Sequence, residues 1–263
     1  RMPSQVRLSL VHGEPDGTFP NGIPNPLLPD RRQATTDAVR ELGADFGVAF
    51  DGDFDRCFFF DGEGRFVEGY YIVGLLAQAI LGRSAPGTPI VYDNRMTWAT
   101  EAAIAAAGGR AVVSRTGHVF LKRALREHGA AYGGEMSAHH YFHAFYSCDS
   151  GMIPWLLIAQ LVGEGDRSLS EHVASAQAAF PCSGEINFRL DNTAAALARV
   201  EAAFAGTGQR EDIDGVSYSF ADWRFNVRLS NTEPLLRLNV ETRGDPALVS
   251  EKTDELRALI EGV

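Results

Sequence analysis

The chain has 263 residues, 45% of them apolar and 22% charged, and its formal net charge is −10. These values are ordinary for a soluble globular protein that can bury a sizeable core. An acidic surface repels phosphate backbones and anionic headgroups, so we expect no nucleic-acid partner and no membrane partner. An anionic ligand would need a local basic site.

The three cysteines, Cys57, Cys148 and Cys182, lie far apart and show no spacing typical of a zinc site. They favour free thiols in a reducing compartment over a disulfide framework. No apolar run reaches transmembrane length, and the N-terminus has no signal-peptide pattern. We therefore expect a cytoplasmic protein. The abrupt start, "RMPSQVRLSL", suggests a fragment of a longer chain.

The first quarter of the chain predicts a long loop, a helix and two strands. Residues 12–30 are rich in Pro, Gly, Asn and Asp and predict an ordered loop. A short helix is expected over Thr35 to Leu42. Two apolar runs, "FGVAF" and "RCFFFD", predict buried strands over 46–50 and 56–61. Three aspartates therefore fall in the connection between two strands.

Residues 70–179 alternate between helix and strand patterns, which is typical of a layered α/β domain with crossover connections. Helices are expected over 70–81, 97–107, 118–128 and 150–162, with Pro154 in a first turn. Strands are expected at "PIVYD", "RAVVS" and "AAY".

After Pro181 the patterns change to mostly strands, with one helix near 193–204 and a final helix over 246–260. This composition predicts a separate, smaller α+β domain of about 85 residues. The predicted fold class is α/β: mixed-sheet α/β domains followed by a smaller α+β C-terminal domain. The expected units are residues 1–65, 66–179 and 180–263.

The segment Asp51-Gly-Asp53-Phe-Asp55-Arg56 gathers three carboxylates that would repel one another without a cation. An EF-hand requires Gly and Glu where this chain has Arg56 and Gly62, so calcium binding of that kind is excluded. Three carboxylates on a short loop between strands suit Mg²⁺, with an open position for a phosphate oxygen. Arg56 could hold that phosphate in a bidentate contact. A solvated acidic turn is the alternative.

Arg115-Thr-Gly-His118 lies where a strand meets a helix, and a helix N-terminus offers free N–H groups to an anion. His118 could act there as an acid or base, with Lys122 one turn further on the same face. A histidine that merely caps the helix is an equal alternative.

Two further loops carry polar side chains. In "GGEMSAHH", Glu135, Ser137 and His139 offer an acceptor, a hydroxyl and a titratable group suited to vicinal hydroxyls, and the paired glycines let a backbone approach a ligand. An ordinary polar turn is the alternative. Later, "RLSNTEP" places a guanidinium, hydroxyls, an amide and backbone N–H groups in one possible anion nest, although it also fits common turn chemistry. Its residues are Arg228, Ser230, Asn231 and Thr232.

The order of these four segments resembles that of the α-D-phosphohexomutases, specifically the bacterial phosphomannomutase/phosphoglucomutase group. The resemblance runs from "DGTFPNGIPNPL" to the C-terminal helix. In that family four domains surround a deep cleft and each contributes one loop. The chain resembles the second half of domain two followed by domains three and four.

The resemblance implies a role for each segment. Asp51, Asp53 and Asp55 match the Mg²⁺ loop, with Arg56 beside it. Glu135, Ser137 and His139 match the sugar-recognition loop, and the turn at Arg228, Ser230, Asn231 and Thr232 matches the phosphate-binding loop. His118, Lys122 and Arg95 match positions near the reacting centre, as candidates for proton transfer and charge stabilisation.

Three departures from the family pattern are visible. Phe54 and Ala138 stand where the family commonly has glycine. The Thr-Ala-Ser-His-Asn-Pro segment that carries the family's phosphoserine does not occur, so the implied partner is a missing N-terminal domain of the same protein.

The implied reaction moves phosphate between O6 and O1 of a hexose, mannose or glucose, through a phosphoserine and a bisphosphorylated sugar, with Mg²⁺ as cofactor. We expect the chain alone to be inactive and to bind hexose phosphate weakly. The alternatives are a non-catalytic sugar-phosphate-binding module and, less favoured, a phosphatase with an Asp-x-Asp nucleophile.

Overall fold

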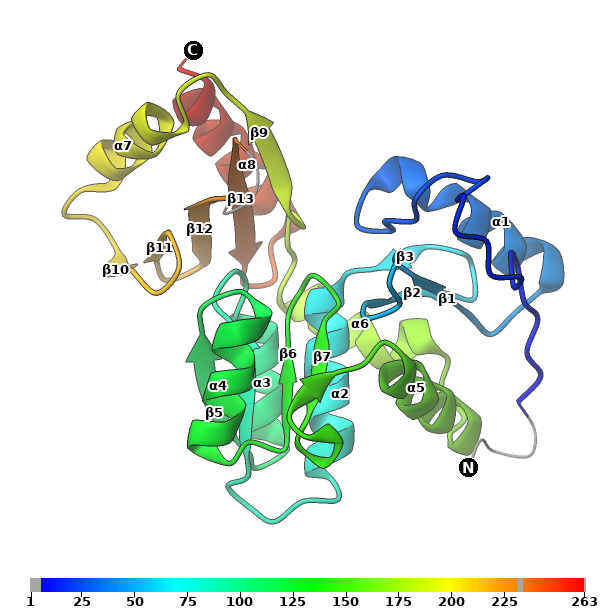
Figure 1. Cartoon of the computed structure of the whole chain (residues 1–263). Coiled ribbons are helices and arrows are strands. Elements are labelled where there is room, and N and C mark those ends of the chain that lie inside the picture. The colour runs from blue at the N-terminus through cyan, green and yellow to red at the C-terminus, as the bar shows by residue number, and fades with distance from the viewer. Residues whose placement is uncertain (1–5, 231–233, 263) are drawn as a thin grey trace.

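The structure is a computed structural model of the chain, and it describes residues 6–230 and 234–262. Three β-sheets follow one another along the sequence, each accompanied by its own helices (Figure 1). The fold class expected from the sequence is confirmed: mixed α/β parts come first and an α+β part follows. Two predicted site residues, Asn231 and Thr232, lie outside the described residues.

The first sheet is antiparallel, in the order β1-β2-β3. The short helix η1 (Pro29–Arg31) and α1 (Gln33–Leu42) precede it. Its strands are β1 (Phe46–Phe50), β2 (Cys57–Asp61) and β3 (Phe66–Val67). Because Phe50 pairs with Cys57, residues 51–56 form the connection between β1 and β2, as the sequence predicted. Every residue of β2 is buried, which fixes one end of this connection.

The second sheet is mixed, in the order β5-β4-β6-β7-β8. Its parallel strands are β4 (Pro89–Asp93), β5 (Arg110–Ser114) and β6 (Tyr132–Gly134). The antiparallel strands β7 (His140–Phe142) and β8 (Cys148–Asp149) complete it, separated by the short helix η2 (His143–Phe145). The sequence analysis placed no strand at β7 or β8, because two or three residues are too few to show a period.

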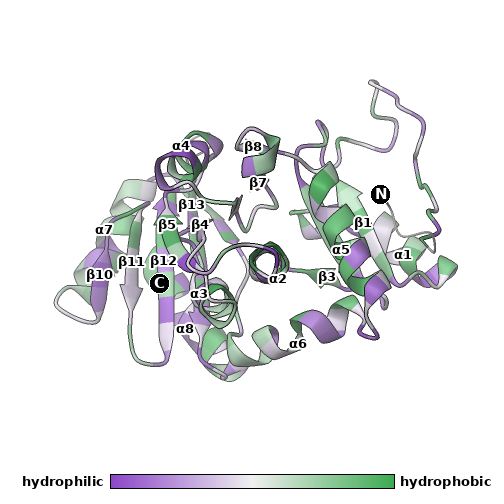
Figure 2. Ribbon diagram, turned by 90° about the horizontal axis from the view of Figure 1, so that it is seen from below, coloured by the Kyte–Doolittle hydropathy of each residue, from purple (hydrophilic) through white to green (hydrophobic). Residues whose placement is uncertain are grey.

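The helices of this part are α2 (Gly69–Leu81), α3 (Trp98–Ala106) and α4 (His118–His128). α2 is apolar on all sides and lies at the centre of the molecule, where Figure 2 shows it nearly end-on. A Cβ on Gly133 would meet Leu125 of α4 at 2.4 Å, and one on Gly134 would meet Val73 of α2 at 2.7 Å. α4 and α2 therefore cover opposite faces of β6.

α5 (Met152–Glu164) and α6 (Leu169–Ala179) follow, and Pro154 lies in the first turn of α5 as predicted. Ser168 begins α6 with a capping box: its side chain accepts from the Glu171 amide, while the Glu171 side chain accepts from the Ser168 amide. α5 packs against both α2 and β2. It therefore joins the first sheet to the second.

The third sheet is antiparallel, in the order β10-β11-β12-β13-β9. Its strands are β9 (Ile186–Arg189), β10 (Gln209–Glu211), β11 (Val216–Ser219), β12 (Trp223–Leu229) and β13 (Leu235–Thr242). The helices α7 (Thr193–Phe204) and α8 (Pro246–Glu261) pack on it around a separate apolar core.

Buried charges join the third sheet to the second. Glu241 on β13 is fully buried and accepts hydrogen bonds from the backbone N–H groups of Thr97 (2.8 Å) and Trp98 (3.1 Å), at the N-terminus of α3. Arg224 on β12 donates to Glu241 (3.1 Å) and to the carbonyl oxygens of Arg95 (3.0 Å) and Asn94 (2.6 Å). A carboxylate at a helix N-terminus is stabilised by the free N–H groups and the helix dipole. This cluster fixes the segment between β4 and α3.

All three cysteines are free thiols, as expected. Among the described residues, no helix is long and apolar enough to cross a bilayer.

Candidate functional site

The connection between β1 and β2 is a tight turn, called here the aspartate turn (Asp51–Asp55). The Phe54 N–H donates to the Asp51 carbonyl (3.3 Å), and Phe54 adopts a positive φ of 63°. Such a backbone conformation favours glycine, because the Cβ of other residues crowds the following carbonyl. The chain thus places Phe54 where the backbone prefers the glycine that the resembling family commonly has.

The carboxylates of the aspartate turn lie close together. One oxygen from each of Asp51, Asp53 and Asp55 falls within 4.8 Å of the others. Asp51 is 2% exposed and accepts from the Arg56 amide (3.1 Å) and the Arg56 Nε (2.6 Å). Asp55 Oδ1 is buried and has no hydrogen-bond partner among the described residues. Arg56 Nε lies 3.9 Å from this oxygen. A buried carboxylate oxygen that lacks a hydrogen bond, beside two more carboxylates, fits a hard divalent cation.

The connection between β6 and β7 is a second turn, called here the glutamate turn (Glu135–His139). The Ala138 N–H donates to the Glu135 carbonyl (3.0 Å), and Ala138 has a φ of 71°. Glu135 is 1% exposed, and its two oxygens accept from the Gly117 amide and the Tyr141 hydroxyl, both at 2.7 Å. The N-terminus of α4, predicted to bind an anion, therefore already holds a carboxylate of the protein itself.

The glycines before the glutamate turn have another purpose than the one predicted. Gly133 and Gly134 were interpreted as giving a ligand access to the backbone. Both are buried within β6, and each lacks a Cβ because a helix packs directly on it. That interpretation is wrong: the constraint is strand–helix packing.

The two turns face each other although they come from different sheets. The Cys57 N–H donates to the Ala138 carbonyl (3.2 Å), and Arg56 and His139 form an isolated β-bridge. His139 Nε2 lies 3.5 Å from Asp55 Oδ2, and His139 Nδ1 lies 3.4 Å from the Ser137 hydroxyl. The metal-loop and sugar-loop candidates thus form one continuous polar surface.

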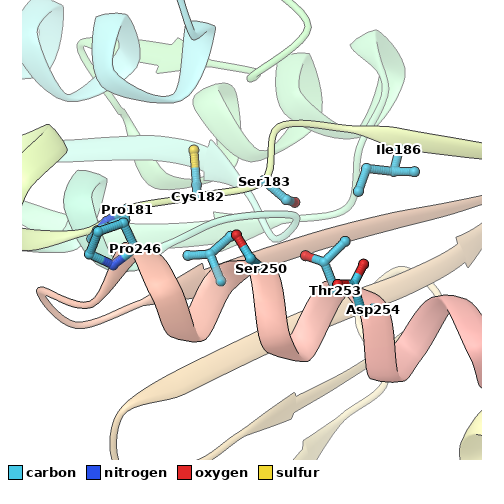
Figure 3. Close-up of a pocket in the computed structure, with 9 residues that line it drawn as sticks. Pro181, Cys182, Ser183, Ile186, Pro246, Ser250, Thr253 and Asp254 are labelled. Atoms are coloured by element: carbon cyan, nitrogen blue, oxygen red, sulfur yellow. The ribbon is translucent and has the colours of Figure 1, made fainter.

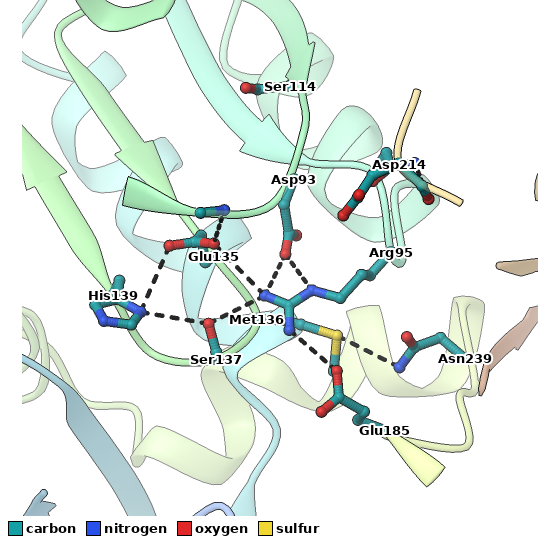
Figure 4. A network of polar contacts seen from close by, with 12 residues as sticks. Asp93, Arg95, Ser114, Glu135, Met136, Ser137, His139, Glu185, Asp214 and Asn239 are labelled. Carbon is teal, nitrogen blue, oxygen red and sulfur yellow. Dashed lines mark hydrogen bonds and ion pairs between the residues drawn. The ribbon is translucent and has the colours of Figure 1, made fainter. Parts of the chain in front are cut away.

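Arg95 extends this network toward the third sheet (Figure 4). Its side chain is 1% exposed, forms an ion pair with Asp93, and donates to the Ser137 hydroxyl (3.0 Å) and Glu185 Oε2 (3.2 Å). Burial opposes the charge of Arg95, but Asp93 and Glu185 outweigh burial and raise its pKa above the usual value. Arg95 therefore keeps its proton, and it suits charge stabilisation rather than proton transfer.

Arg228, at the end of β12, is 4% exposed and donates to Glu185 Oε2 (3.1 Å). Burial, and then the positive charge of Arg95, lowers the pKa of Arg228. The Ser230 N–H donates to the Leu235 carbonyl (2.9 Å), which holds together the described ends of the connection between β12 and β13. The first two members of the predicted anion site thus lie at the end of the same network.

Two candidates lie at the edge of this network: Lys122 reaches it through Asp149, which has an oxygen within 4.8 Å of ligand atoms of Asp55 and His139. Lys122 Nζ forms an ion pair with Asp149 Oδ1 (2.6 Å). His118 is the first residue of α4 and is exposed. Within the described ranges, no hydrogen bond or ion pair joins His118 to another predicted site residue. Its neighbour Gly117 connects it to the glutamate turn through Glu135.

Sequence reasoning missed Glu185, Asp93 and Asp149. Asp93 had a usable signal, because it ends a buried parallel strand, where functional groups gather. Asp149 belongs to a two-residue strand and shares a possible cation-binding group with Asp55 and His139. Glu185 lies between a glycine and a half-buried strand, and nothing in its sequence surroundings distinguishes it.

A groove of about 500 Å³ lies outside this network (Figure 3). It runs between the segment Pro181–Ser183 and α8, and its lining includes Ser250 and Thr253. Of the predicted site residues that the structure describes, none lines it.

Three family models match successive parts of the chain. The model described as "Phosphoglucomutase/phosphomannomutase, alpha/beta/alpha domain II" matches residues 2–64. The corresponding model of alpha/beta/alpha domain III matches residues 68–180, and that of the C-terminal domain matches residues 185–259.

Individual proteins agree with these models. The chain is 62% identical over 256 residues to a phosphomannomutase of Salmonella montevideo, covering 97% of this chain and 56% of that protein. It is 59% identical over 253 residues to a protein of Xanthomonas campestris pv. campestris named "Phosphohexose mutases", covering 96% and 56%. A crystal structure of a phosphoglucomutase/phosphomannomutase family protein from Burkholderia thailandensis superposes with a TM-score of 0.77 at 27% identity, covering 94% and 53%. The chain spans about half the length of these relatives.

Proposed function

The chain belongs to the phosphoglucomutase/phosphomannomutase family, the α-D-phosphohexomutases, and from this premise we propose that it provides the metal-, sugar- and phosphate-binding parts of a hexose-phosphate mutase. One observation supports the proposal most directly. An unbroken path of polar contacts runs from Asp55 through His139, Ser137, Arg95 and Glu185 to Arg228. The path joins residues that accompany all three sheets, which supports one shared site; the proposed domain boundaries lie near residues 65 and 180.

Asp51, Asp53 and Asp55 would hold Mg²⁺. The ion, when bound, neutralises negative charge on a phosphoryl group. Arg56 keeps Asp51 in place through two hydrogen bonds, so its proposed part is to orient this carboxylate beside the phosphate.

The sugar end of the ligand would meet the glutamate turn. Ser137 and His139 are half-buried and present a hydroxyl and an imidazole beside the aspartate turn. Glu135 is buried and both of its oxygens already accept hydrogen bonds, so its proposed part is to fix the turn that presents Ser137 and His139. Arg95, charged and immobile, would stabilise negative charge at the transferring group.

The phosphate that does not react would bind at Arg228 and Ser230, together with Asn231 and Thr232, whose roles rest on the family resemblance. Arg228 provides a planar guanidinium suited to a phosphate dianion. His118 and Lys122 remain candidates for proton transfer near the opposite phosphate, with Lys122 positioned by Asp149.

The phosphoryl donor is the part that this sequence does not supply. The family's Thr-Ala-Ser-His-Asn-Pro segment is absent from the 263 residues. We therefore expect the purified chain to bind hexose phosphates without converting glucose 1-phosphate to glucose 6-phosphate.

Calorimetric titration of the purified chain with mannose 6-phosphate, glucose 6-phosphate and inorganic phosphate, with and without Mg²⁺, tests the proposal. We expect the hexose phosphates to bind more tightly than inorganic phosphate. Ser137→Ala should weaken hexose-phosphate binding only, whereas Arg228→Lys should weaken the binding of both ligand types. Ser250→Ala, on the exposed face of α8, is the matched control. Equal binding of all three ligands, or unchanged binding in Arg228→Lys, contradicts the proposal.

A further inference from the structure

Glu185 joins three arginines at the point where the second and third sheets meet. Its carboxylate is 4% exposed. Oε2 accepts from both Arg95 (3.2 Å) and Arg228 (3.1 Å), and Oε1 accepts from Arg237 (3.2 Å). One oxygen atom is therefore shared between an arginine of the sugar-binding side and an arginine of the phosphate-binding side.

The arginines need this carboxylate in order to lie close together. Arg228 and Arg237 are directly opposite each other on the antiparallel strands β12 and β13. Like charges in that position repel, and the buried guanidinium of Arg95 adds a third positive charge. Burial alone would raise the pKa of Glu185, but Arg95, Arg228 and Arg237 outweigh burial and hold it below the usual value. Glu185 is therefore ionised and compensates this repulsion.

A second buried contact also joins the two sheets. Arg224 and Glu241 are almost fully buried, and they bind the backbone of the segment that carries Arg95. That cluster docks the third sheet on the second without involving Glu185. Two of the three contacts of Glu185 are made instead by Arg95 and Arg228 of the proposed site, and the third is made by Arg237, which pairs with Arg228 across β12 and β13.

We propose that Glu185 is a positioning residue that couples the phosphate-binding and sugar-binding sides of the site. This inference rests on the proposed function. Glu185 fixes the position of the Arg228 guanidinium relative to that of Arg95. Arg95 in turn fixes the position of the Ser137 hydroxyl. A hexose phosphate contacts both sides of the site, so it binds tightly only when the phosphate-binding and sugar-binding groups are correctly positioned relative to each other. A free phosphate ion needs only the Arg228 end.

Glu185→Gln tests the coupling, with Glu251→Gln on α8 as the control that removes the same charge at an exposed position. We expect Glu185→Gln to lower the affinity for mannose 6-phosphate about tenfold. The affinity for inorganic phosphate should stay the same or rise, because a neighbouring negative charge is gone. A general loss of structure would lower the affinity for both ligands together. Parallel losses, or unchanged affinity for both ligands, overturn the inference.

A measurement without ligand separates this inference from the proposed function. In ¹⁵N-arginine-labelled protein, the guanidinium N–H signals of Arg95 and Arg228 should exchange slowly with water, because their ion pairs are buried. Lys substitutions assign the signals. Glu185→Gln should speed exchange at Arg228 by about tenfold or more; unchanged exchange overturns the inference. Slow exchange in a wild-type chain that binds no hexose phosphate would contradict the proposed function but leave the positioning by Glu185 intact.

Discussion

The aspartate turn and the glutamate turn share one backbone design in two different surroundings. Each begins with a buried acidic residue, Asp51 or Glu135. The backbone carbonyl of that residue accepts a hydrogen bond from the N–H three positions later. In each, that later residue has a positive φ without being glycine. The next residues, Asp55 and His139, then face each other.

The surroundings decide how firmly each turn is held. Phe54 is 61% exposed, and its ring lies 5.5 Å from that of Phe50. Ala138 is 1% exposed, and its carbonyl accepts from the N–H of Cys57, the first residue of β2. The same strained backbone is therefore enclosed by tertiary packing in the glutamate turn, whereas in the aspartate turn the Phe54 carbonyl packs on Gly151 but the side chain stays exposed. A change in side-chain shape should therefore destabilise the buried glutamate turn more than the exposed aspartate turn.

The largest difference should appear between two single variants, each with valine at one of the positive-φ positions. A β-branched residue is strongly disfavoured there, and Ala138 has no room for added atoms. We expect Ala138→Val to lower the free energy of unfolding by about 3 kcal/mol, and Phe54→Val by only about 1 kcal/mol. Urea denaturation of the two variants measures the difference. Equal losses would mean that burial does not distinguish the turns.

A pH effect should come next, from His140 directly after the glutamate turn. Burial, and to a smaller extent His139, lowers the pKa of His140 to about 3. The unfolded chain binds this proton near pH 6.5, so stability is present above that pH and is lost as the pH falls from 6.5 toward 3.

His140→Phe removes that titration. Between pH 6 and 4 we expect wild type to lose about 1.4 kcal/mol per pH unit more than the variant. Urea denaturation at several pH values gives both slopes, and parallel slopes would show that His140 is protonated in the folded protein.

A smaller difference in stability loss is expected when the first residue of each turn, Glu135 or Asp51, is replaced by its amide. Glu135→Gln weakens two hydrogen bonds to a charged acceptor and should cost about 2 kcal/mol. Asp51→Asn also removes one of three mutually repelling charges, so its loss should be less than half as large when Mg²⁺ is absent. Thermal unfolding in chelator measures both. A greater loss in Asp51→Asn would indicate that the aspartate turn is the more rigid one.

The smallest effect should come from restoring glycine. Phe54→Gly relieves the left-handed conformation while removing little buried surface, but it also frees the unfolded chain, so we expect a gain of only about 0.5 kcal/mol. Ala138→Gly also loses a buried methyl group and should give no gain. A gain in Ala138→Gly that exceeds the gain in Phe54→Gly would contradict the comparison.

Local patterns predicted most helices and strands of this chain. The runs "FGVAF", "PIVYD" and "RAVVS" coincide with β1, β4 and β5, and the helix over 193–204 has the predicted bounds. The paired turns were only partly predictable. The alternation of aspartates placed one turn between two strands, but its contact with the glutamate turn joins residues about 80 positions apart, and no local period encodes such a contact.

The sequence by itself determined the element types, the acidic charge, and which segments carry carboxylates, hydroxyls and guanidinium groups, because these follow from residue type and from periods of a few positions. Only the tertiary structure decided that Asp55 faces His139, that Gly133 serves packing, and that Glu185 lies among three arginines. Those outcomes depend on how three sheets dock. Docking is set by buried surfaces and buried charges, such as Arg224 with Glu241, whose partners lie far apart along the chain.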